Sequence, residues 1–164
     1  MTLVLIGPPG SGKTRLGKRV AKLINLPFVD TDKVVVANHG AIADIFATYG
    51  EPHFRRLERE AVADALSQNA VVSLGGGAVL DADTQRDLAG HRIALLTVSP
   101  AAVESRISGG KRPLLSGGID AWSALVESRR QLYENLGERV WDTSSRPLDD
   151  IAKEIARWAR EGKP

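Results

Sequence analysis

The sequence predicts an α/β fold of three layers, in which a parallel five-stranded sheet carries helices on both faces. Short apolar runs of four to six residues alternate along the chain with longer stretches whose apolar side chains recur at helical spacing. Single connections between alternating strands and helices favour parallel strands. The 164 residues fit one domain, because domains typically contain about 100–200 residues. We therefore expect a single domain over residues 1–164.

The expected strands are short and rich in branched apolar residues, which is typical of strands buried on both faces. They are 3–6, 27–29, 71–74, 93–98 and a fifth strand near Trp141. The expected helices are 13–24, 51–67, 81–89, 100–107, 121–137 and 148–160. In the second of these, Leu57, Ala61 and Val62 share one apolar stripe. Residues 108–120 lack periodicity and contain two glycine pairs, which is typical of a lid or a disordered loop.

Composition and charge exclude several classes of protein. Lys and Arg number 22 against 20 Asp and Glu, and both signs are interspersed, which disfavours a nucleic-acid-binding protein. The absence of Cys excludes a disulfide framework and a Cys-ligated metal site. The N-terminus has neither a basic region nor a long apolar run, so we expect no signal peptide and no membrane-spanning helix. We expect a cytoplasmic protein and, because no long apolar face is left over, a monomer.

A phosphate-binding motif directly follows the first expected strand. Residues 7–14 read GPPGSGKT, which matches GxxxxGK[ST], and a helical pattern opens at Lys13. Glycines allow backbone N–H groups to point inward at a helix N-terminus, Lys13 would reach the β- and γ-phosphates, and Thr14 would hold Mg²⁺. A glycine-rich turn is the alternative, but this pattern arises by chance in roughly one window per 10⁴. We predict nucleoside triphosphate binding by Gly10, Ser11, Gly12, Lys13 and Thr14.

Two carboxylates stand just beyond the second expected strand. Asp30 and Asp32 are two residues apart, and at strand spacing both side chains would point the same way at the carboxyl edge of the sheet. One could orient a metal-bound water, and the other could accept a proton from a substrate hydroxyl. The alternative is a helix cap, with one of residues 30–32 capping the pattern that begins at Lys33.

Three consecutive glycines, Gly75, Gly76 and Gly77, follow the third expected strand. They indicate a backbone brought against a ligand with no side chain in between, although a loose turn is the alternative. Because a strand end needs at most one or two glycines to turn, we favour a ligand-binding loop.

Arginine outnumbers lysine by 15 to 7, and guanidinium groups bind carboxylates and phosphates bidentately. Arg55 lies near the start of the helix expected over 51–67, and Glu58, three residues later on the same face, can hold its guanidinium group in place. Arg112 lies in the expected lid and Arg129 on the helix after it. Any one of these could be a solvated surface residue, but the set favours a site for an anionic small molecule facing the nucleotide. A GTPase is disfavoured, because the chain has no Asn/Thr-Lys-x-Asp run.

In chain order, the sequence reads GPPGSGKT, FVDTD, AIADIFATYGEPHFRRLE, SLGGGAV, KRPLL and SRRQLY. Together these segments resemble the shikimate kinases, which belong to the nucleoside-monophosphate-kinase-like P-loop group. The resemblance covers essentially the whole chain. It implies a P-loop kinase with a lid over 109–120 and a substrate-binding region over 31–60. It also implies Mg²⁺-dependent transfer of the γ-phosphoryl group of ATP to a ring hydroxyl of shikimate, in aromatic amino-acid biosynthesis.

The resemblance also implies roles for individual residues. Asp32 matches the substrate-binding aspartate proposed as the base, and Arg55 and Arg129 match the arginines that grip the shikimate carboxylate. Further matches are Gly75, Gly76 and Gly77 lining the shikimate pocket, Lys13 and the lid residue Arg112 acting in catalysis, Arg112 also contacting ATP, Thr14 and Asp30 at the magnesium position, and Arg106 and Arg146 on the adenine side.

Two other classes of function stay open at this point. A gluconate kinase or an adenylate kinase belongs to the same group, but the first would lack the combination of DTD, GGG and RPLL, and the second needs another nucleotide pocket. A nucleotide-binding regulatory module without turnover is the alternative outside the enzymes. The presence of every catalytic position disfavours it: Lys13, Thr14, Asp30, Asp32 and Arg112.

Overall fold

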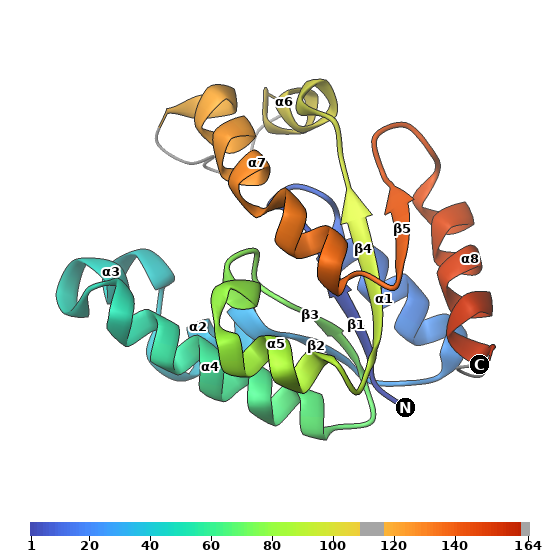
Figure 1. The fold of residues 1–164 in the computed structure, drawn as a ribbon, viewed down its shortest axis with the longest axis horizontal. Helices are drawn as coiled ribbons and strands as arrows, with labels where there is room; N and C mark the ends of the chain where they lie inside the picture. Colours follow the sequence, from blue (N-terminus) through green and yellow to red (C-terminus); the bar gives the residue numbers. More distant parts are fainter. Residues whose placement is uncertain (109–116, 162–164) are drawn as a thin grey trace.

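The computed structural model describes residues 1–108 and 117–161, and it confirms a parallel sheet with helices on both faces (Figure 1). Five strands pair in the order β2-β3-β1-β4-β5, and all four pairings are parallel. The strands are β1 Leu3–Ile6, β2 Phe28–Asp30, β3 Val71–Ser73, β4 Arg92–Thr97 and β5 Arg139–Asp142. Each lies within one or two residues of its expected position. Strands β1, β3 and β4 are buried apolar runs, which is typical of the central strands of such a sheet.

Two of the α-helices, Thr31–His39 and Ile42–Tyr49, were not among the expected helices, although a helical pattern from Lys33, capped by one of residues 30–32, was the alternative for the first. In chain order the helical elements are α1 Lys13–Ile24, α2 Thr31–His39, α3 Ile42–Tyr49, α4 Glu51–Ser67, η1 Ala78–Leu80, α5 Ala82–Leu88, α6 Pro100–Ser108, α7 Gly118–Leu136 and α8 Leu148–Arg160. Helix α2 was missed because its three consecutive valines are typical of strands, and only Thr31 and Val35 are buried. Helix α7 begins at Gly118, within the segment expected to be a loop.

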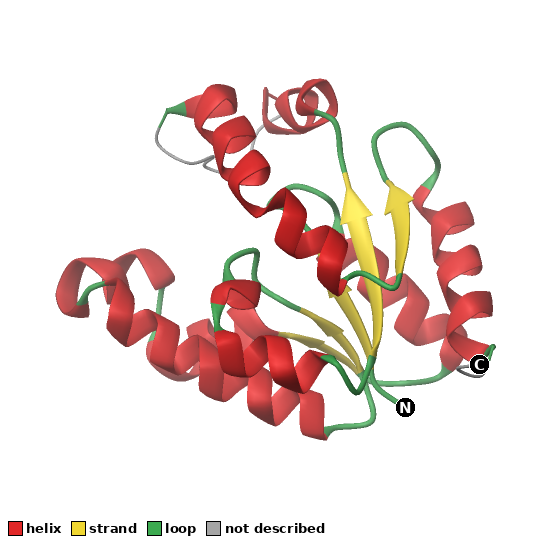
Figure 2. Ribbon diagram, viewed as in Figure 1, coloured by secondary structure: helices red, strands yellow, loops and turns green. Residues whose placement is uncertain are grey.

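Alternating side chains of β1 divide the core into two parts, one on each face of the sheet. Leu3 and Leu5 pack with residues of α1 and α8. Val4 and Ile6 pack with residues of α4, α5 and α7. All four are fully buried, and burial of each contributes about 1.5–3 kcal/mol. Figure 2 shows the resulting layers, with the strands between two groups of helices.

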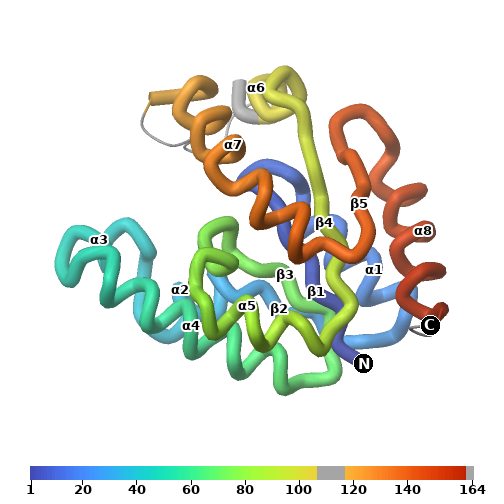
Figure 3. Tube along the Cα trace, in the orientation of Figure 1, coloured from blue at the N-terminus to red at the C-terminus, as the bar shows by residue number. Residues whose placement is uncertain are grey.

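The topology brings three segments to one edge of the sheet: the phosphate-binding motif after β1, the pair of aspartates after β2 and the three glycines after β3. Strands β2, β3 and β1 are neighbours, so the segments that follow them emerge side by side at their carboxyl ends. In parallel α/β sheets this edge is where ligands bind. The trace in Figure 3 shows α2 and α3 extending to one side of this edge, with α6 and the start of α7 on another.

Within the described part of the chain, no helix is both long and apolar enough to cross a membrane.

Candidate active site

The phosphate-binding motif forms the expected connection between β1 and α1. Gly10 and Gly12 have φ angles of 82° and 88°, which side chains other than glycine rarely adopt, so both positions need glycine. Gly12 immediately precedes α1, so the helix begins at the loop and presents its first N–H groups there. The Lys13 Nζ donates hydrogen bonds to the carbonyl oxygens of Gly7, at 2.8 Å, and Pro8, at 3.0 Å. The ammonium group is therefore held at the loop.

Asp30 connects the phosphate-binding loop to α2. Its Oδ2 accepts a hydrogen bond from Thr14 Oγ1 at 2.6 Å, and its Oδ1 accepts one from the Lys33 backbone N–H at 3.2 Å. The second contact makes Asp30 the N-cap of α2, as the alternative interpretation of the sequence proposed. The first places a hydroxyl and a carboxylate oxygen together, which is the type of donor that Mg²⁺ prefers.

Asp32 does not share a strand face with Asp30, so that prediction was wrong. Strand β2 ends at Asp30, and Asp32 lies in the first turn of α2 because the cap starts a helix there. The two carboxylates nevertheless interact. Burial raises the pKa of Asp32, and the charge of Asp30 raises it further, whereas the positive charges of Lys13 and Arg55 lower it. Asp32 therefore lies within electrostatic range of Lys13 in the phosphate-binding loop and of Arg55.

Residues 75–77, which we call the glycine loop, lie directly against charged side chains. A Cβ atom on Gly75 would be 2.4 Å from Asp32 Oδ1, and one on Gly77 would be 2.5 Å from Arg55 Nη1. A Cβ on Gly76 would be 3.3 Å from Pro9 Cδ and 3.5 Å from Arg129 Nη1. Gly77 has φ −95°, which any residue adopts, so these glycines provide space rather than an unusual backbone. A loose turn would not require such contacts.

Arg55 is held by acidic side chains on its own helix. Its Nη1 donates to Glu58 Oε1 at 2.8 Å, which confirms the expected contact, and its Nη2 lies 3.3 Å from Glu51 Oε1. The Glu58 side chain is 5% exposed, and burial raises its pKa although Arg55 acts in the opposite direction. The ring of Phe54 lies 5.4 Å from the guanidinium carbon. Arg55 is therefore oriented before any ligand arrives.

Helix α7 contributes the second cation of this region, the half-buried Arg129. Arg129 lies close enough to Glu58 and Tyr133 to lower the pKa of both groups. Tyr133 is buried, which raises its pKa, and its hydroxyl donates to Gly76 O at 2.8 Å. Arg55 and Arg129 thus approach the glycine loop from two different helices.

Trp122 and Tyr133 were missed as site residues by the sequence analysis. Trp122 is buried, and its Nε1 donates to Pro9 O at 2.8 Å. A single aromatic residue in a helical pattern normally indicates packing, so the sequence offered little signal. The spacing of Tyr133 four residues after Arg129 was the one available indication.

The two basic residues expected on the adenine side occupy different surroundings. Arg106 donates to the carbonyl oxygens of Gly10, at 2.8 Å, and of Thr143, so it connects the phosphate-binding loop to the segment after β5. Arg146 is exposed and pairs with Glu154 on α8. The Thr143 Oγ1 donates to Ser11 O at 2.7 Å, which is a second link between the segment after β5 and the phosphate-binding loop. Arg112 and the other lid residues within 109–116 lie outside the described residues.

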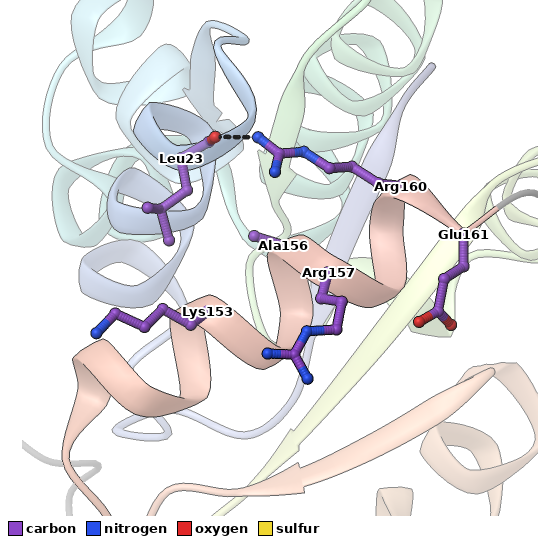
Figure 4. A pocket seen from close by; sticks show the side chains of 6 residues that line it. All are labelled: Leu23, Lys153, Ala156, Arg157, Arg160 and Glu161. Carbon is purple, nitrogen blue, oxygen red and sulfur yellow. Dashed lines mark hydrogen bonds between the residues drawn. The ribbon is translucent and has the colours of Figure 1, made fainter.

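A hollow of about 490 Å³ at the far end of α1 and α8 does not resemble this arrangement (Figure 4). Its cations, Lys153, Arg157 and Arg160, point in different directions rather than toward one point. Arg160 donates to the carbonyl oxygen of Leu23 at 2.5 Å, near the end of α1. This hollow therefore lacks the convergence of charged side chains seen around the glycine loop.

Comparisons with known proteins agree with this geometry. The family model described as shikimate kinase matches residues 9–160. A shikimate kinase of Salinispora arenicola is 44% identical over 157 residues, which cover 93% of this chain and 94% of the relative. One of Corynebacterium efficiens is 39% identical and covers 93% of both chains. A solved shikimate kinase from Acinetobacter baumannii, in complex with shikimate, matches with a TM-score of 0.88 and 28% identity, over 96% of this chain and 91% of that one.

Proposed function

The chain belongs to the shikimate kinase family, and on that premise we propose how its residues transfer the γ-phosphoryl group of ATP to shikimate. The products are shikimate 3-phosphate and ADP. The observation that carries the assignment of roles is the glycine loop, since Asp32, Arg55 and Arg129 all lie against it. A carboxylate and two guanidinium groups around bare backbone suit a small acid that carries hydroxyl groups.

On the nucleotide side, the residues of the phosphate-binding loop would hold the β- and γ-phosphates. The N–H groups at the start of α1 and the Lys13 ammonium would bind phosphate oxygens in place of their present partners. We place Gly10, Ser11, Gly12, Lys13 and Thr14 in this role.

The oxygen atoms of Thr14 and Asp30 fit a magnesium ion, because a hydroxyl and a carboxylate already lie 2.6 Å apart beside the phosphate-binding loop. No group of three or more His, Cys, Asp or Glu side chains suited to a metal occurs among the described residues, so two side chains and the phosphates would share the ion. When bound, Mg²⁺ would neutralise negative charge on the β- and γ-phosphates. Thr14 would hold it directly, and Asp30 through water.

On the shikimate side, Arg55 and Arg129 would bind the carboxylate and fix the ring in one orientation. Asp32 would then accept a hydrogen bond from the reacting hydroxyl and take its proton late in the transfer. Its raised pKa suits this role, because the carboxylate becomes a stronger base while the nearby cations still favour its ionised form. Gly75, Gly76 and Gly77 would allow the ring to approach the backbone.

The remaining roles concern closure and the adenine base. Arg112, from the lid over 109–120, would approach the transferred phosphoryl group and help to exclude water. Arg106 would cover the adenine ring, because its contacts to Gly10 and Thr143 place it beside the loop that holds the phosphates. Arg146 would contribute on the same side only after separating from Glu154.

We further propose that residues 1–164 form one kinase domain that acts as a cytoplasmic monomer on small molecules, without a nucleic-acid partner. The nearly balanced charge supports the last point. Size-exclusion chromatography with light scattering tests the oligomeric state, and a mass near 17.6 kDa is expected.

A coupled assay of ADP formation tests the function directly, with Mg-ATP held constant and shikimate titrated. Saturable ADP formation that depends on shikimate, but not on gluconate or AMP, is expected. ATP binding without any response to shikimate would support only the nucleotide-binding role of the phosphate-binding loop and would overturn the proposed substrate.

A further inference from the structure

Two aromatic residues of α7 are attached to the two loops that would bind the substrates. Trp122 is 1% exposed, and its indole Nε1 donates to Pro9 O in the phosphate-binding loop. Tyr133 is 4% exposed, and its hydroxyl donates to Gly76 O in the glycine loop. Both hydrogen bonds measure 2.8 Å, and both carbonyl groups belong to loop backbone rather than to a helix or strand.

The positions of these residues on α7 place them on one face of the helix. They are eleven residues apart, which is close to a whole number of turns at about 3.6 residues per turn. Arg129 lies between them and on the same face. One rigid element therefore contacts the phosphate-binding loop, carries a cation to the glycine loop, and binds the glycine loop itself.

The two loops also touch each other at the same place. A Cβ atom on Gly76 would lie 3.3 Å from Pro9 Cδ, so the residues that accept the two hydrogen bonds are neighbours. Any change in how α7 sits would thus alter the relative position of the two loops. The N-terminus of α7 has no side-chain cap, and Gly117 and Gly118 before and at its first residue both have positive φ. Trp122 is then the first hydrogen-bonded attachment of α7 to the phosphate-binding loop after these glycines.

Packing alone does not account for this pattern. Trp122 also packs against Val98 and Val103, and Tyr133 packs within the core between the sheet and α4. Apolar side chains of similar size would serve that purpose. A buried indole N–H and a buried hydroxyl instead each require a partner, and each has found a carbonyl in a different loop.

We propose that Trp122 and Tyr133 are positioning residues, through which α7 fixes the separation of the phosphate-binding loop from the glycine loop. The inference rests on the proposed roles of these two loops. It extends them, because neither residue would touch ATP or shikimate. Their effect would be on how closely the γ-phosphate approaches the shikimate hydroxyl, and geometry at the reacting atoms strongly affects rate.

The test compares Trp122→Phe and Tyr133→Phe with the full-length wild-type chain. Tyr133→Phe removes only the hydroxyl, and we expect the shikimate KM to rise about two- to tenfold with a fall in kcat and little change in the ATP KM. For Trp122→Phe we expect the larger change in the ATP KM, again with a lower kcat. A double variant should lower kcat further than either single variant.

Trp158→Phe is the matched control, because Trp158 is also buried but packs on the opposite face of the sheet, against Trp141. It should lower the melting temperature and leave kcat and both KM values unchanged. If either variant at Trp122 or Tyr133 keeps kcat and both KM values within twofold, whatever its melting temperature, the proposal is wrong.

If Trp122→Phe does not fold, Tyr133→Phe decides the proposal alone, since it keeps the aromatic ring. A wild-type chain that lacks shikimate-dependent turnover would instead refute the proposed function, so the two failures are distinguishable.

Discussion

Replacing Gly75 with alanine would place a methyl group 2.4 Å from Asp32 Oδ1, where an ordinary contact between such atoms measures about 3.4 Å or more. The carboxylate must therefore move by about 1 Å. The Asp32 side chain is short and half-buried, and it lies near Asp30 and Arg55, so few directions are open to it. Misplacement of a reacting group by about 1 Å can cost about 100-fold in rate, and we expect Gly75→Ala to lower kcat by about that factor.

The assay is steady-state ADP release with both substrates saturating, together with thermal unfolding. Because the clash falls on a side chain rather than on backbone, Gly75→Ala should change the melting temperature little while it lowers kcat strongly. Gly90→Ala is the matched control, since the nearest atom to its added methyl group would be Asp87 O at 4.0 Å, and it should keep full activity. A Gly75→Ala variant with kcat within threefold of wild type would refute the reasoning, because Asp32 would then have no fixed place in the reaction.

Three further predictions concern charged groups of the site. Arg129→Ala should raise the shikimate KM at least tenfold and spare the ATP KM, since a lost guanidinium–carboxylate contact costs about 1.5–3 kcal/mol; an unchanged shikimate KM would exclude Arg129 from the carboxylate site. Lys13→Ala should abolish turnover. Titration of the wild type with EDTA should also abolish turnover, and added Mg²⁺ should restore it. Near-normal kcat in either experiment would contradict the proposed phosphate site. Asp32→Asn should lower kcat and yet unfold at a higher temperature than the wild type at pH 7, because the raised pKa means that ionised Asp32 destabilises the fold. The difference in melting temperature should shrink as the pH falls toward 3.8, the ordinary pKa of Asp. A lower melting temperature for the variant at pH 7 would contradict the destabilising charge.

Most of the sheet could be predicted because β1, β3 and β4 are buried almost throughout, which makes them nearly continuous apolar runs. The same rule explains the failure at α2, whose valine run looks like a strand but follows a capping aspartate. A cap is a matter of one side chain meeting one backbone N–H, and the letters FVDTD do not distinguish that from a strand end. Consequently the sequence analysis expected Asp30 and Asp32 at the carboxyl edge of the sheet, but its reason, strand spacing between the two, does not apply to Asp32.

The candidate site was predictable where one residue type has few other uses. Glycine triplets and GxxxxGK[ST] are of this kind, and the structure places both at the same edge. Trp122 could not be recognised, because its importance depends on Pro9, which is 113 residues away in the sequence and meets it only in the fold. The pairing of Arg146 with Glu154 was invisible for a similar reason, since it depends on how α8 packs.

Two carboxylates of the site, the buried Glu58 and the half-buried Asp32, link its activity to its stability. Glu58 and Asp32 are both carboxylates whose pKa values are raised, first of all by burial, so both resist ionisation where they stand. Glu58 is compensated by Arg55 at 2.8 Å, but Asp32 interacts with Asp30 as well as with cations. A site built only for stability would replace Asp32, whereas binding an alcohol and accepting its proton needs a carboxylate that is incompletely paired. Shikimate would supply the missing hydrogen bond, and it should therefore stabilise the wild type against heat more than it stabilises Asp32→Asn.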